Sequence, residues 1–236
     1  MFSQAIKTGF SALRSLFRSW TTLVLVAVLY GGLLVAVYLF VSTREATISQ
    51  LVITLAAILI APVLFFALQA VSVNYATNTG AMHLIKKTVQ DSLRLIAVSL
   101  PLILLTALAV YGLSKINSQA TLVTGARYLL IGVIAPLLAI QLWVAASAEG
   151  LRSLLRRVHR IVARAFAPQS VFVYACGVLF FAVAPYLLIF LHVEIERTWL
   201  EISLLVIRLS IGALLIVIGW VTTVGTLSIL GKQSRC

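Results

Sequence analysis

Long apolar runs alternate with short polar segments along this chain, and the pattern predicts six membrane-spanning helices. A bilayer core about 30 Å thick needs a helix of about 20 apolar residues. Six stretches reach that length without an acidic residue: Trp20–Val41, Leu51–Val73, Leu95–Leu113, Tyr128–Ala148, Val171–Leu191 and Leu204–Leu230. The predicted fold class is therefore all-α, a polytopic membrane bundle of about six transmembrane helices.

Three shorter segments repeat their apolar residues every three or four positions, which predicts amphipathic helices lying at the membrane surface. The clearest is 151–166, where an apolar stripe opposes an arginine at every fourth position: Arg152, Arg156, Arg160 and Arg164. The first segment, 1–19, carries the stripe Phe2, Ile6, Phe10, Leu13 and Phe17. A weaker stripe follows residue 80, made of Met82, Ile85, Val89 and Leu93. The stripes either face lipid or pack on the spans of the same chain, and the pattern leaves both open.

The order amphipathic helix, span, span occurs three times, which predicts a threefold helix-hairpin repeat within one membrane domain, 1–236. Its parts are an interfacial helix (1–19), hairpin 1 (20–73), an interfacial segment with hairpin 2 (80–148), an interfacial helix with hairpin 3 (150–230) and a tail (231–236). A short match supports the repeat, because the sequence IAPVL at 60–64 recurs as IAPLL at 134–138.

The charges predict how the chain is oriented. The chain is 62% hydrophobic and 10% charged, with a net charge of +12, whereas a soluble domain is about 25% charged. Thirteen of the 18 basic residues fall on one side of the predicted spans: Lys7, Arg14, Arg18, Lys86, Lys87, Arg94, Arg152, Arg156, Arg157, Arg160, Arg164, Lys232 and Arg235. Four fall on the other side: Arg44, Lys115, Arg127 and Arg197.

The positive-inside rule therefore predicts that both termini are cytoplasmic. The expected location is a cell (inner) membrane. The mitochondrial inner membrane is the alternative, since residues 1–19 also have the composition of a transit peptide.

Catalytic chemistry has little support in the sequence. The predicted spans hold no carboxylate, the three histidines are isolated, and neither a hydrolase nor a nucleotide-binding motif occurs. The two cysteines have no metal-binding or disulfide spacing. We therefore expect no catalytic residue, no metal and no cofactor, and thus no enzyme. The basic residues lie between apolar runs and not on a soluble module, so we expect no nucleic-acid partner.

The candidate contact residues are of two kinds. For anionic lipid or a partner they are Arg152, Arg156, Arg160, Arg164, Lys86 and Lys87. The candidate intramembrane polar site consists of Arg208, Gln69 and Gln141. Arg208 either extends toward headgroups from a tilted last helix or faces the bundle and binds an acidic group. The glutamines are expected to hydrogen-bond between helices. Gly212, Gly219 and Thr226 recur at heptad spacing and predict a close-packing face.

In layout the chain resembles two groups of proteins. One is the six-span permease subunits of ABC-type exporters, which also begin with an interfacial helix, and the other is bacterial membrane domains built from interfacial-helix hairpins. The resemblance covers the whole chain but rests on no motif, so no functional residue is transferred. We expect a non-catalytic membrane component, acting as a subunit or scaffold of a larger membrane assembly or in lipid handling. Its expected partners are anionic lipids and other membrane subunits. The alternative is a permease for a hydrophobic or amphiphilic substrate.

Overall fold

The computed structural model describes residues 2–43, 47–76, 80–115, 121–149, 154, 157–191 and 198–233. Every secondary-structure element in this part of the chain is a helix. In order they are α1 (Phe2–Arg18), α2 (Trp20–Ser42), α3 (Ile48–Asn74), α4 (Ala81–Lys115), α5 (Thr121–Leu129), η1 (Leu130–Ile134), α6 (Ala135–Glu149), α8 (Val158–Ala165), α9 (Pro168–Val178), η2 (Leu179–Val183), α10 (Ala184–Phe190) and α11 (Thr198–Gln233).

Six of the helices are long and apolar enough to cross a membrane, which confirms the all-α class and the six predicted spans. Two of them pass through a short π-helix, η1 or η2, without ending. Two are much longer than the apolar runs, since α4 has 35 residues and α11 has 36. The segment around Met82 is therefore not a separate helix but the first turns of α4. The chain has the helices of a polytopic membrane protein.

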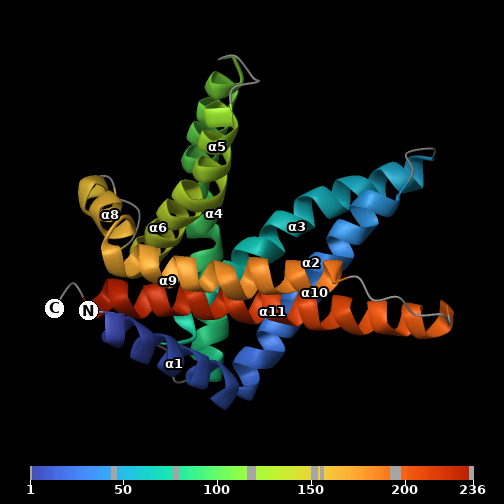
Figure 1. The fold of residues 1–236 in the computed structure, drawn as a ribbon, viewed down its shortest axis with the longest axis horizontal. Helices are drawn as coiled ribbons and strands as arrows, with labels where there is room; N and C mark the ends of the chain where they lie inside the picture. The colour runs from blue at the N-terminus through green and yellow to red at the C-terminus, as the bar shows by residue number, and fades with distance from the viewer. Residues whose placement is uncertain are drawn as a thin grey trace.

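The helices form three arms that diverge from a shared base (Figure 1). The first arm is α2 with α3, and the second is α4 with α5 and η1. The third is α10 with α11, reached from the base through α9. Helix α1 lies across the base and packs along the last turns of α11. The beginning of α1 and the end of α11 meet there, and Phe2 stacks edge-on against Phe172 of α9 at 4.8 Å between ring centroids.

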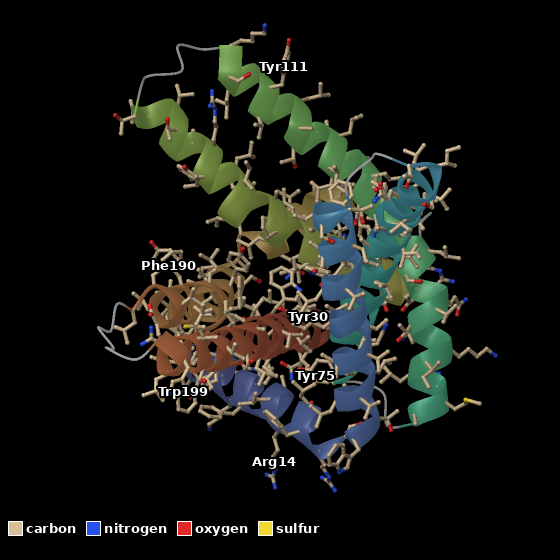
Figure 2. The ribbon with its side chains drawn as sticks, turned by 90° about the vertical axis from the view of Figure 1, so that its right-hand side faces the viewer. Arg14, Tyr30, Tyr75, Tyr111, Phe190 and Trp199 are labelled. Carbon is tan, nitrogen blue, oxygen red and sulfur yellow. The ribbon has the colours of Figure 1, made fainter. Side chains whose placement is uncertain are left out.

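The arms separate so far that their tips do not touch each other. Figure 2 shows Tyr111 at the tip of the second arm, well apart from Phe190 and Trp199 at the tip of the third. Arg14 lies at the opposite end, on the base. The base therefore carries the packing between arms.

Burial follows the same division. The larger core joins residues near the base ends of α3, α4, α6, α9 and α11, among them Val73, Leu95, Leu137, Tyr174 and Leu227. A smaller core joins α1, α2, α3 and α11 around Leu16, Val71 and Val221. Toward the tips most apolar side chains are exposed, including Leu104 and Leu105 of α4. Lipid tails are as apolar as leucine, so such surfaces are stable in a bilayer without any protein partner.

A face of three small residues and one leucine, and not the predicted apolar stripe, holds α1 to the base. Its buried positions are Ala5, Thr8, Ala12 and Leu16, which recur every three or four residues. The predicted stripe points elsewhere, with Phe10 69% exposed and Phe17 54% exposed. Short side chains let α1 approach α11 closely, since Gly9 lies against Thr226. The corresponding stripe of α4 is also exposed, including Met82 and Leu93. In α8, Ile161 and Ala165 are buried while Val158 and Val162 are exposed.

Both π-helices come directly before an Ala-Pro pair, 135–136 and 184–185. Proline has no N–H to donate, and its ring clashes with the carbonyl four residues earlier. One extra residue in the turn relieves that clash, which is a common origin of π-bulges. Pro62 of the 60–64 match lies inside α3 without a π-helix. The two copies of this short motif therefore differ in local structure, and the threefold repeat stays a prediction.

Candidate functional site

An apolar crevice lies in the second arm. Its volume is about 790 Å³, and it lies between α4 on one side and η1 and α6 on the other. Phe65 and Phe66 of α3 and Trp220 of α11 form its end toward the base. Volumes of about 300–1,000 Å³ are typical of small-molecule sites, so the crevice is large enough to hold a ligand.

Aromatic rings surround the base end of the crevice and their polar atoms are already paired. Trp143 packs edge-on against both Phe65 and Phe66. Its indole N–H donates to Ser99 Oγ at 2.8 Å. The indole N–H of Trp220 donates to Gln69 Oε1 at 2.7 Å. Both rings thus present their apolar surfaces to the crevice.

Two hydroxyl groups along the α4 wall, those of Thr106 and Ser114, also have partners. Thr106 Oγ1 donates to the carbonyl of Leu102 at 2.8 Å, and Ser114 Oγ donates to that of Tyr111 at 2.6 Å. The remaining wall is mostly aliphatic, with Ile103, Val110 and Ile131. The crevice therefore suits an apolar chain better than a polar solute, which would lose its water without gaining hydrogen bonds.

A buried polar cluster closes the base beyond the aromatic rings. Asp91 of α4 is 1% exposed and accepts hydrogen bonds at Oδ2 from Asn74 Nδ2 (2.9 Å) and Ser147 Oγ (2.7 Å). Ser147 also lies 3.0 Å from Asn74 Oδ1. Arg94 reaches Asp91 Oδ1 at 3.5 Å. Asn74 belongs to α3, Asp91 to α4 and Ser147 to α6. The cluster therefore joins the first arm to two helices at the base of the second arm.

Two further hydrogen bonds join α3 to neighbouring helices at the base. Ser228 Oγ of α11 donates to the carbonyl of Val73 at 2.8 Å. The Tyr75 hydroxyl donates to the carbonyl of Ala12 in α1 at 3.3 Å. Burial raises the pKa of the Tyr75 phenol, so this group is a neutral donor at physiological pH. The base is thus a dry, hydrogen-bonded junction.

Of the three residues predicted as an intramembrane polar site, Gln69 and Gln141 lie between packed helices. Gln69 is 1% exposed and bonds Trp220 across the α3–α11 contact. Gln141 is 4% exposed and faces Gly231 of α11. Gln69 thus makes a hydrogen bond between helices, as expected, whereas the same role for Gln141 stays a prediction.

Arg208 lies apart from the glutamines, near the tip of the third arm. Its guanidinium donates to the carbonyl of Leu191, directly after the last residue of α10. Arg127 of α5 does the same in the second arm, donating to the carbonyl of Leu113 in the last turn of α4 at 3.2 Å. Terminal helix carbonyls lack an intrahelical donor and carry partial negative charge. Each arginine therefore caps the preceding helix of its own arm.

The predicted lipid-contact residues are at the base. Lys86 and Arg160 are exposed, while Lys87 and Arg164 are half-buried. Arg164 has an interaction partner. Arg152 and Arg156 lie outside the described residues. The arginine ladder is therefore described only in its second half.

The close-packing face predicted on α11 is confirmed. Gly212 lies against Ile189 of α10, Gly219 against Phe181 of η2, and Thr226 against Gly9 of α1. Two glycines that the sequence pattern did not single out make even closer contacts, Gly177 with Thr223 and Gly225 with Tyr75. A side chain at either position would overlap its neighbour.

The sequence pattern missed the polar cluster and the crevice. Asp91 was the one acidic residue of the predicted interfacial segment after residue 80, among Lys86, Lys87 and Arg94, and it lies shortly before an apolar run. Its solitary position was a usable signal, because a lone acid among basic residues commonly has a structural partner. Nothing in sequence separation linked it to Ser147, 56 residues later.

Comparison of the chain with models of known protein families, with curated proteins and with solved structures finds no match.

Proposed function

We propose that this protein is a non-catalytic integral membrane protein that handles lipids by holding an acyl chain in the crevice of its second arm. The observation that carries the proposal is the chemistry of that crevice. It has about 790 Å³ of space and aromatic and aliphatic walls, and its two indole groups and the hydroxyls of Ser99, Thr106 and Ser114 already have partners. An acyl chain has no hydrogen bonds to water to lose on entering the crevice, and it gains van der Waals contacts with the walls.

The length of the crevice also fits an acyl chain. Its α4 wall runs from Ser99 to Ser114, about 22 Å at a rise of 1.5 Å per residue. One leaflet supplies about half of the 30 Å hydrocarbon core. A single lipid tail is therefore accommodated along the wall.

The same proposal places the base at the cytoplasmic surface of a bacterial-type inner membrane, with both termini on that side. The exposed basic residues Lys7, Arg14, Lys86 and Arg160 are at the base, whereas Lys115 ends α4 at a tip. The exposed apolar stripes of α1 and α4 support interfacial placement, because they remain free to enter the headgroup region. Three pairs of consecutive spans support a threefold hairpin plan.

The proposal keeps two neighbouring functions open to test. A subunit or scaffold of a larger membrane assembly would use the exposed arms as docking surfaces. A permease for an amphiphile would need the crevice to open through the base as well. There Asn74, Asp91 and Ser147 are buried and bonded to one another, which favours binding over passage.

The test is photocrosslinking of the purified full-length protein in bilayer nanodiscs with a phospholipid that carries a diazirine on one acyl chain. We expect adducts on crevice residues such as Leu102 and Ala139. Ala107→Trp fills the crevice and should reduce those adducts about tenfold.

Ala109→Trp is the matched control, since Ala109 is on the same helix at nearly the same depth, is exposed and does not line the crevice. Adducts that are equally strong in both variants would show that lipid does not occupy the crevice. Co-purification of one stoichiometric membrane protein would favour the scaffold function instead.

A further inference from the structure

A second hollow, separate from the crevice, lies on the other side of α11. It is a groove of about 560 Å³ between α1, α9 with η2, and α11. From α11 it receives Gly219, Thr222 and Thr226, whereas Trp220 faces the crevice. Its α1 wall includes the exposed residues Ile6, Phe10 and Phe17 of the predicted stripe, together with the half-buried Leu13. The groove therefore opens along the same helix face that is proposed to enter the membrane.

The groove has no free hydroxyl donor to offer a polar occupant, because its threonine hydroxyls already donate within α11. Thr222 donates to the carbonyl of Ile218, Thr223 to that of Gly219 and Thr226 to that of Thr222. The other groove residues are apolar or small, including Phe172, Cys176 and Phe180. An extended peptide segment here would bury unpaired amides at a high free-energy cost. An acyl chain carries no such groups.

Helix α1 has a third face, which is basic. At 3.6 residues per turn, Lys7, Arg14 and Arg18 fall on the face next to the apolar stripe and away from the small residues that contact α11. All three are exposed, and Figure 2 shows Arg14 pointing away from the body of the protein. Within the described part of the chain none of them forms a salt bridge. No acidic residue occurs in α1 or α9, and Glu201 of α11 is in its first turn, at the far end.

We infer that this groove and the basic face of α1 together form a binding site for an anionic phospholipid, with one acyl chain in the groove and the phosphate at Lys7 and Arg14. Charge complementarity selects the headgroup, and the apolar groove selects the chain. The inference extends the proposed lipid-handling function to a second site. It shares the membrane placement of that proposal but not the crevice.

The experiment uses the full-length protein in nanodiscs of equal parts phosphatidylcholine and phosphatidylglycerol, with native mass spectrometry of the lipids that stay bound. The wild type should retain phosphatidylglycerol in preference to phosphatidylcholine. Each basic residue near an anionic headgroup contributes roughly fivefold in affinity. K7Q/R14Q/R18Q should therefore lower the ratio of the two retained lipids by at least about fivefold. K86Q/K87Q/R160Q removes the same number of charges from other candidate lipid contacts on the base and should lower the ratio by less, because these residues do not line the groove.

A second pair of variants tests the groove without changing charge. Cys176→Trp fills the groove and should remove one bound lipid per protein. If the tryptophan variant does not fold, Cys176→Leu is the smaller change to use, and it should remove that lipid in part. Ala175→Trp is the control, because Ala175 is exposed and outside the groove.

Three results would overturn the inference. One is equal loss of preference in the two charge variants, which means a general surface effect. Another is full lipid retention in Cys176→Trp. The third is loss of the preference in Ala107→Trp, which would place the anionic lipid in the crevice. Preserved preference in Ala107→Trp supports a separate site even if acyl crosslinking in the crevice fails.

Discussion

At the scale of single residues, a side chain from one helix replaces the hydrogen bond that a proline removes from another. Pro136 has no N–H for the carbonyl of Gly132, four residues earlier. The hydroxyl of Tyr174, on α9, donates to that carbonyl at 2.6 Å. The π-helix η1 contains Gly132 and turns its carbonyl toward α9. A distortion in one arm thus becomes a contact with another.

Tyr174→Phe should therefore lower the free energy of unfolding by about 1 kcal/mol, the usual contribution of an interhelical hydrogen bond in a membrane protein. The ring stays, so its edge-on contact with Phe181 is kept. Unfolding by SDS titration of the purified protein measures the change. Tyr186→Phe is the control, because Tyr186 is exposed and packs only its ring against Phe190. Equal stability of the two variants would show that the hydroxyl contact contributes nothing.

Asp91 has a larger expected effect. Asp91→Ala leaves the buried groups of Asn74 and Ser147 without their shared acceptor, and breaking such a network costs about 2–4 kcal/mol. Ser92→Ala is the matched control: Ser92 is the next residue, is also buried, and bonds only the carbonyl of Val89 in its own helix. The same SDS titration compares the two. A difference below about 0.5 kcal/mol would mean that the cluster is not a stabilising junction.

The sequence predicted some of these residues and not others for a physical reason. Gln69 and Gln141 stood out because a polar side chain inside an apolar run must find a partner. Arg208 stood out for the same reason, but its partner is a backbone carbonyl. Such a partner leaves no trace in the residue pattern. Asp91 sat among other polar residues, so its burial depended on how α3, α4 and α6 meet.

At the scale of helices, close contacts are made by small residues and not by the most apolar ones. In water an apolar stripe is driven into the core, but in a bilayer lipid solvates it equally well. This explains why Phe10 and Phe17 were predicted correctly as one face of α1 but lie exposed, while Ala5 and Ala12 are buried. Periodicity predicted the helices and their faces. It could not say which face contacts protein.

Gly177→Leu tests the importance of these close contacts. Even a Cβ at Gly177 would overlap the side chain of Thr223, so α9 and α11 must move apart. We expect loss of most folded protein, seen as aggregation in size-exclusion chromatography in mild detergent. Gly125→Leu is the control, since a Cβ at Gly125 meets nothing within 4 Å. An intact, equally stable Gly177→Leu protein would argue against a tight α9–α11 contact.

At the scale of the whole molecule, the sequence predicted the number of spans but not their divergence. Six apolar runs follow directly from hydropathy, and the structure confirms them. The splay depends on where the few packing contacts lie, at the base around Val73, Leu95 and Leu227. The exposed apolar residues toward the tips do not indicate the angle at which each arm leaves the base, because lipid solvates them equally well at any helix tilt. The crevice was unpredictable for the same reason.

The divergence gives the two ends of the molecule different surfaces, and from this follows a prediction of topology. The exposed basic residues of α1 and of the first turns of α4 are at the base, and the positive-inside rule places such residues in the cytoplasm. Ser49 and Ser114 are exposed at the tips of two arms, and Ser3 and His83 are exposed at the base.

Single cysteines at these four positions, in a C176S/C236S background, can be labelled in intact cells with a membrane-impermeant maleimide. Ser49→Cys and Ser114→Cys should react directly, because the tips reach the outer surface. Ser3→Cys and His83→Cys should react only after the membrane is permeabilised. Two positions are used on each side so that a poorly reactive cysteine is not mistaken for an inaccessible one. Each side is assigned only when both of its positions agree. Labelling of the base positions in intact cells would show that the topology is the reverse of the predicted one. The basic face of α1 would then not contact the anionic cytoplasmic leaflet. Labelling of only one of the two tip positions would mean that one of these arms does not cross the membrane. Both arms start from the same base, so both tips must reach the outer surface if both arms cross.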